Sequence, residues 1–223
     1  MKFNAYPDRD FLHLKLADRI ASQLGEFIRR DGRATLSVPG GTTPGPVFDI
    51  LSGVDLDWAL VSVVLNDERW VPEHSDRSNT RLLRERLLTG RAANARLIPL
   101  YTATDTPEEG IPALEEGLRA ALPISVLLLG MGGDMHTASL FPGADRLTDA
   151  LAPDAPLLMP MRSEAAVEPR VTLTAPVLRD AMHIHVLITG EAKREAIEKA
   201  AGLPVEEAPI RTVLDLAEVH WAE

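Results

Sequence analysis

An aspartate and a histidine stand two residues apart in a glycine-rich stretch, GMGGDMH at residues 130–136. A lone histidine is more often structural than catalytic, but His136 next to Asp134 at the end of an apolar run is a candidate general base near neutral pH. No second histidine or cysteine stands at a metal-ligand spacing from it, so we predict no metal. The stretch indicates acid–base chemistry.

Three other places offer groups that could bind an anion. PGGTTPG at residues 39–45 presents backbone N–H groups of Gly40 and Gly41 and the hydroxyl of Thr42, although a plain tight turn would have the same composition. Lys193 stands in the first turn of an expected helix, where a cation opposes the helix dipole unless it faces an anion. Arg170 begins another apolar run. Each cation could equally be a solvated surface residue, so the prediction of a phosphate site depends on their coming together.

The sequence NDERW at residues 66–70 supplies further charges at the end of an apolar run. Asp67, Glu68 and Arg69 could form an ordinary solvated cluster. Alternatively, Arg69 projects into a site to polarise a carbonyl group or bind a carboxylate, and Asp67 orients its neighbours.

Alternating apolar runs and amphipathic stretches must position these groups. We expect strands at 34–38, 61–65, 95–100, 124–129, 170–174, 183–189 and 219–223, and helices at 11–28, 46–51, 80–88, 106–121, 175–181 and 191–201. Gly32 should end the first helix, Ser78 or Asn79 should cap the third, and Thr106 with Glu109 has capping-box spacing. The run at 124–129 is apolar on both alternations, which is typical of a strand covered on both faces.

This alternation predicts one α/β domain over residues 1–223, with a mainly parallel central sheet and helices on both faces. The polar clusters at 39–45, 66–69, 130–136 and 190–193 each follow an apolar run. Because ligands bind beyond the carboxyl ends of parallel strands, all four clusters should lie at one edge of the sheet.

The composition excludes several classes of partner. A net charge of −10 with few aromatic residues argues against nucleic acid, and hydrophobic residues at 45% with charged residues at 25% are typical of a soluble globular protein. The absence of cysteine excludes disulfides, and neither a signal peptide nor a membrane-spanning run is apparent. We expect a cytoplasmic protein that is a monomer or a weak dimer. Dinucleotide binding is not predicted, because the G-x-G-x-x-G pattern begun by Gly130 has Met135 at its sixth position.

Taken together and in order, PGGTTPG, NDERWVPEHSDRSN, GMGGDMHTASLFPG, RVTLT and GEAKREAI resemble the 6-phosphogluconolactonases over roughly residues 10–222. The resemblance implies a Rossmann-like three-layer α/β/α sandwich and hydrolysis of 6-phospho-D-glucono-1,5-lactone without a cofactor. The implied catalytic residues are His136 as the base, Arg69 at the carbonyl oxygen, and Asp134 or Asp67 as the orienting carboxylate. The implied phosphate-binding residues are Gly40, Gly41, Thr42, Arg170 and Lys193.

Two positions depart from the family pattern. The usual Ser-Gly-Gly-Ser-Thr-Pro is here Val38 to Pro44, and the glycine that usually precedes the histidine is Met135. A glycine there indicates a positive φ or a close backbone neighbour, either of which is costly for methionine. Two alternatives remain: an amino-sugar-phosphate deaminase or isomerase, disfavoured because Ser139 to Gly143 contain no carboxylate, and a sugar-phosphate sensor without activity.

Overall fold

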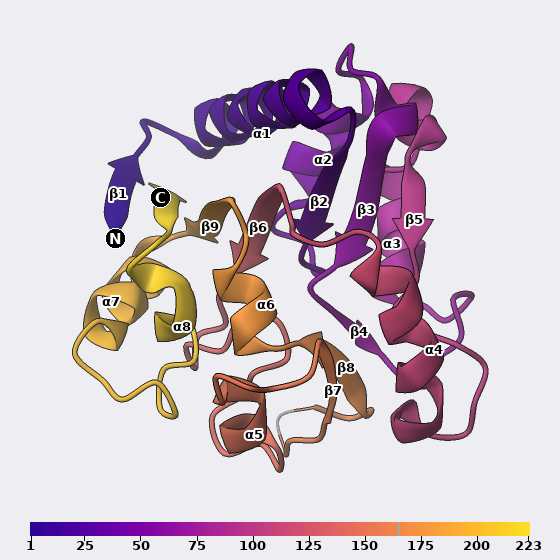
Figure 1. The fold of residues 1–223 in the computed structure, drawn as a ribbon. Helices are drawn as coiled ribbons and strands as arrows, with labels where there is room; N and C mark the ends of the chain where they lie inside the picture. Colours follow the sequence, from indigo (N-terminus) through magenta and orange to yellow (C-terminus); the bar gives the residue numbers. More distant parts are fainter. Residues whose placement is uncertain (165) are drawn as a thin grey trace.

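The computed structural model describes residues 1–164 and 166–223, and a parallel sheet forms its centre (Figure 1). In this described part, seven strands pair in the order β1-β10-β9-β6-β2-β3-β5. Their bounds are β1 (Lys2–Ala5), β10 (Glu218–Ala222), β9 (His183–Thr189), β6 (Val126–Gly130), β2 (Ala34–Val38), β3 (Val61–Leu65) and β5 (Arg96–Ile98). Every neighbouring pair is parallel. The predicted fold class is confirmed; β1 was not predicted.

Helices flank this sheet and connect its strands (Figure 1). They are α1 (Arg9–Asp31), α2 (Gly45–Ser52), α3 (Asn79–Arg86), α4 (Pro107–Arg119), α5 (Leu147–Leu151), α6 (Ala175–Arg179), α7 (Glu191–Ala200) and α8 (Arg211–Leu214), with 3-10 turns η1 (Trp58–Leu60) and η2 (Gly90–Asn94). In α1, Asp8 caps the first turn, the apolar stripe from Leu12 to Leu24 is buried, and Gly32 ends the helix at φ 71°. Ser78 caps α3, as predicted.

The order of the strands places two glycine-rich loops side by side. From β2 the chain continues outward through β3 and β5, whereas β6 pairs on the other side of β2 and leads to β9. The winding direction therefore reverses between β2 and β6, where open α/β sheets bind ligands. Residues Val126 to Leu129 of β6 have no exposed surface, which confirms the prediction of a strand covered on both faces.

A small antiparallel sheet corrects the prediction in two places. It contains β4 (Asp67–Arg69), β8 (Arg170–Leu173) and β7 (Leu158–Met161), in the order β4-β8-β7. Residues 67–69 were expected to be a loop, and β7 was not expected. Asn66 separates β3 from β4, and its side chain donates to the carbonyl oxygen of Leu128 at 2.8 Å while accepting from Ser37. This cross-strand anchor redirects the chain out of the central sheet.

The predicted capping box at Thr106 is wrong. Thr106 does precede α4, but in the described chain its side chain accepts no backbone hydrogen bond. Pro107, in the first turn, supplies a φ already suited to a helix and needs no N–H partner. As for the membrane, none of the described helices has the length and apolar character to cross one.

Candidate functional site

A pocket of about 350 Å³ opens at the carboxyl ends of β2, β3, β6 and β9. Its walls come from residues 39–41, 43 and 44, from Asp67, Arg69 and Asn79, from residues between 130 and 141, from Arg170, and from residues between 187 and 193. Each of the four polar clusters predicted to share one edge of the sheet contributes to it. The prediction that they meet is therefore confirmed, and the rule of ligand binding at this edge explains it.

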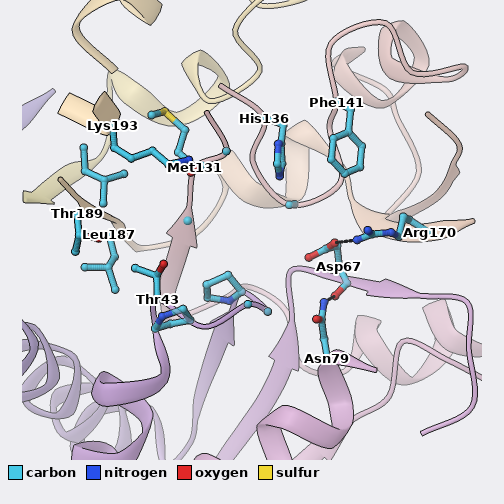
Figure 2. Close-up of a pocket in the computed structure, with 18 of the residues that line it drawn as sticks. Thr43, Asp67, Asn79, Met131, His136, Phe141, Arg170, Leu187, Thr189 and Lys193 are labelled. Carbon is cyan, nitrogen blue, oxygen red and sulfur yellow. Dashed lines mark hydrogen bonds and ion pairs between the residues drawn. The ribbon is translucent and has the colours of Figure 1, made fainter. Parts of the chain in front are cut away.

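The His136 ring projects into this pocket (Figure 2). Its Nδ1 lies 2.5 Å from Oδ1 of Asp134, which also accepts the backbone N–H of His136 at 3.2 Å. Because an ionised carboxylate only accepts, Nδ1 carries a proton and Nε2 is left free to take one. Burial alone would raise the pKa of Asp134, but the charge and hydrogen bonds of His136 outweigh burial and lower it. This arrangement suits a general base with a fixed tautomer.

The loop that carries His136 is a tight turn with little freedom. Gly132 N donates to the carbonyl oxygen of His136 at 2.9 Å, and Met135 N donates to that of Gly132 at 3.1 Å. A side chain at Gly132 would collide with His136 Nδ1, since a Cβ there would lie 2.1 Å away. Met135 has φ 66°, in the left-handed region, which is one of the two reasons expected for the glycine that the resemblance implies at this position. Its carbonyl oxygen accepts from Ile210 N at 3.0 Å, so the strained residue is fixed on both sides.

Arg170 and Asp67 form the wall of the pocket beside Phe141 (Figure 2). Both side chains are buried, and Arg170 Nη1 lies 3.4 Å from Asp67 Oδ2. The same carboxylate oxygen accepts from the Ser139 hydroxyl at 2.5 Å, which ties this wall to the histidine loop. Burial lowers the pKa of Arg170. The charge of Asp67 acts against this lowering, and the charge of Arg69 adds to it. Asp67 therefore positions Arg170 and Ser139.

Lys193 approaches the pocket from the opposite side (Figure 2). Its Nζ donates to the carbonyl oxygen of Met131 at 2.7 Å. Burial lowers the pKa of Lys193, opposed by the charge of Asp134. Lys193 and Arg170, both predicted to hold one phosphate, thus stand on different walls.

The remaining predicted residues surround the space between these walls. Gly40 and Gly41 line the pocket, whereas Thr42 is exposed and does not belong to the described lining; Thr43 does. Arg69 lines the pocket and donates from Nη1 to the carbonyl oxygen of Arg77 at 2.6 Å. Its buried Nε has no hydrogen-bond partner among the described residues.

Asn79 is a pocket residue whose role the sequence did not predict. Its side chain is buried and donates to the backbone carbonyl of Asp67 at 3.1 Å. A Cβ at Gly40 would lie 2.1 Å from its Oδ1, so only glycine fits there. The sequence offered one signal, the Ser-Asn pair at residues 78–79, which was interpreted as a helix cap and as part of the family motif but not as a pocket residue.

Comparisons with known proteins identify the family of this chain. The family described as "Glucosamine-6-phosphate isomerases/6-phosphogluconolactonase" matches residues 7–221. A 6-phosphogluconolactonase of Rhizobium meliloti is 44% identical over 93% of this chain and 92% of its own length, and one of Mesorhizobium japonicum is 43% identical over 99% and 94%. The crystal structure of a 6-phosphogluconolactonase from Shewanella baltica superposes with a TM-score of 0.97 at 36% identity, covering 100% of this chain and 98% of that one. A monomeric glucosamine-6-phosphate deaminase at 17% identity and TM-score 0.81 shares the fold. The chain therefore belongs to the glucosamine-6-phosphate isomerase/6-phosphogluconolactonase family.

Proposed function

We propose that this chain is an enzyme that hydrolyses 6-phospho-D-glucono-1,5-lactone to 6-phospho-D-gluconate in the oxidative pentose phosphate pathway. The observation that carries the proposal is His136, held by Asp134 and directed into a pocket that also contains Arg69 and Lys193. Relatives named 6-phosphogluconolactonase that match along nearly the whole chain support this choice of substrate.

The reaction needs a base, an oxyanion stabiliser and a positioned water. Nε2 of His136 takes a proton from a water molecule. The oxygen of this water attacks C1 of the lactone, and the carbonyl oxygen gains negative charge. The guanidinium of Arg69, which lines the pocket, stabilises that charge. The bond between C1 and the ring oxygen then breaks, and His136 returns the proton to the departing oxygen. Asp134 holds the imidazolium formed in between.

Binding uses both walls of the pocket. In this proposal the phosphate binds the ammonium group of Lys193 and the backbone N–H groups of Gly40 and Gly41, which all line the pocket. In this proposal Arg170 does not bind the phosphate, contrary to the prediction, because its ion pair with Asp67 holds it on the opposite wall of the pocket. Thr43 replaces Thr42 as the hydroxyl that faces the ligand.

The test is hydrolysis of freshly generated lactone, followed by proton release and corrected for spontaneous opening. Wild type should exceed the background rate, and His136→Ala should lose most of that excess. His74→Ala is the matched control, since His74 is exposed and lies outside the described pocket lining. A wild-type rate equal to background would refute the lactonase function, and a fully active His136→Ala would remove His136 from the mechanism.

We also propose the setting in which this activity occurs. The chain would act as a single domain on a small sugar phosphate, as a monomer or weak dimer in the cytoplasm, without nucleic acid or membrane as partner. The net charge of −10 supports the exclusion of polyanions. Light scattering coupled to gel filtration would contradict the assembly state if it showed a stable higher oligomer.

A further inference from the structure

Glu68 is a carboxylate at the site that the mechanism above does not use. It lies in β4 between two pocket residues, Asp67 and Arg69, and its side chain has no exposed surface. No lysine or arginine in the described chain lies within ion-pair distance of it. A buried carboxylate without a cation requires compensation by hydrogen bonds.

The compensation comes from the start of α3. Oε1 accepts from the backbone N–H groups of Arg69 and Asn79, both at 2.8 Å. Oε2 accepts from the backbone N–H and the hydroxyl of Thr80, both at 2.7 Å, and from the Ser78 hydroxyl at 3.2 Å. Glu68 thus satisfies the free N–H groups of a helix N-terminus and joins that helix to β4.

This junction determines where one wall of the pocket stands. Asn79, whose N–H binds Glu68, donates from its side chain to the backbone of Asp67 and leaves Gly40 no space for a Cβ. The position of the glycine turn proposed to hold the phosphate therefore depends, through contacts of Asn79, on the position of α3. Arg69, on the other side, has its own N–H fixed by the same carboxylate.

We propose that Glu68 is a positioning residue for lactone hydrolysis: through Asn79 and Arg69 it fixes the glycine turn and the oxyanion-binding arginine relative to each other. The inference rests on the proposed function for its kinetic consequence. Its structural part, the control of the turn at residues 39–45 by a carboxylate in another strand, stands independently of the substrate.

Glu68→Gln is the sharpest perturbation, because it keeps the shape and removes only the charge and one acceptor. Each carboxylate oxygen accepts from at least one backbone N–H group. In either orientation of the glutamine amide, its NH₂ group therefore faces a backbone N–H donor and cannot accept a hydrogen bond from it. We expect kcat/KM to fall at least about tenfold at a temperature where the variant is folded. Asp8→Asn, which removes the charge but keeps an acceptor oxygen at the cap of α1, outside the described pocket lining, is the matched control and should leave kcat/KM unchanged.

Two readouts separate positioning from loss of stability. Hydrogen exchange of the Gly45 amide, which donates to the carbonyl oxygen of Thr42 at 3.2 Å, should accelerate in Glu68→Gln but not in Asp8→Asn. In a double-mutant cycle, Asn79→Ala should cost less in the Glu68→Gln background than in wild type, because both changes act through Asn79. If Glu68→Gln is too unstable to assay, Glu68→Asp keeps the charge, withdraws it by one methylene, and should change both readouts in the same direction.

A folded Glu68→Gln with wild-type exchange of the Gly45 amide would overturn the proposal, as would losses that simply multiply in the cycle. Failure of the proposed function gives a different result. A wild type without lactonase activity would refute that function, while the exchange measurement, which needs no substrate, would still decide the role of Glu68.

Discussion

Replacing Met135 tests whether the histidine loop tolerates a side chain where relatives of this family are expected to have glycine. Met135 has φ 66°, a region that costs an L-residue about 1 to 2 kcal/mol. Its side chain is half-buried and packs against the core. The residue therefore contributes an unfavourable backbone term and a favourable packing term, and a pair of variants separates them.

The packing term is about 1 kcal/mol, since complete burial of a methionine contributes about 1.5 to 3 kcal/mol and this side chain is only partly buried. Met135→Ala loses this packing contribution and keeps the strain of the left-handed backbone. Met135→Gly loses it as well but relieves about 1 to 2 kcal/mol of strain, against about 0.5 to 1 kcal/mol of extra backbone entropy in the unfolded chain. Met135→Gly should therefore be more stable than Met135→Ala by about 0.5 to 1 kcal/mol.

Urea unfolding at neutral pH measures this difference, and steady-state kinetics measures its effect on the site. We expect kcat/KM of both variants within about threefold of wild type, because backbone bonds from Met135 to Gly132 and Ile210 fix the turn without the side chain. Equal stability of the two variants would show that residue 135 does not occupy the left-handed region in solution. A gain of tenfold or more in kcat/KM for Met135→Gly would show that methionine holds His136 away from its productive position.

Three further predictions concern the site and the core. Asp134→Asn should lower kcat about 10- to 100-fold with a smaller change in KM, because the neutral amide no longer stabilises the imidazolium; an unchanged kcat in steady-state assays would remove Asp134 from the mechanism. Lys193→Ala should raise KM about tenfold or more with less effect on kcat, and an unchanged KM would exclude Lys193 from the phosphate site. Burial lowers the pKa of His185 to about 3 and that of His220 to about 4, below the value near 6.5 in the unfolded chain. The unfolded chain therefore binds more protons, and the free energy of unfolding should fall as pH drops below about 6.5, by up to about 1.4 kcal/mol per pH unit for each histidine. Urea titrations from pH 7 to 4.5 check this, and an equal slope for wild type and His220→Gln would contradict it.

The sequence predicted the parts of the site that follow from local pattern and one topological rule. Apolar runs identified β2, β3, β6 and β9, and the expectation of parallel pairing was enough to bring four loops to one edge. A positive φ at Met135 was one of two expectations drawn from the family pattern, the other being a close backbone neighbour. None of these inferences depends on contacts between particular side chains.

What the sequence could not predict depends on contacts between distant residues. Arg170 pairs with Asp67, 103 positions away, and this contact places it opposite Lys193. The sequence indicated no partner for His220, yet its buried ring hydrogen-bonds to two side chains. Its Nδ1 lies 2.8 Å from the hydroxyl oxygen of Tyr6, and its Nε2 lies 3.0 Å from Nδ1 of His185. Glu68 looked like one more charge in a solvated cluster, and only the packing of α3 onto β4 shows that it is buried. No periodicity encodes such pairings.

The distribution of charge also explains how an acidic chain can bind a phosphate. Most arginines that form ion pairs here do so with exposed carboxylates, as Arg81 does with Glu85 and Arg179 with Asp215. In the described chain, neither Lys193 nor Arg69 lies within ion-pair distance of a carboxylate; carbonyl oxygens hold both. A carbonyl fixes the position of a cation without neutralising its charge. The pocket therefore keeps two cations available to an anionic ligand although the chain as a whole carries −10, and the lowered pKa of Lys193 reflects the burial that a bound phosphate would offset.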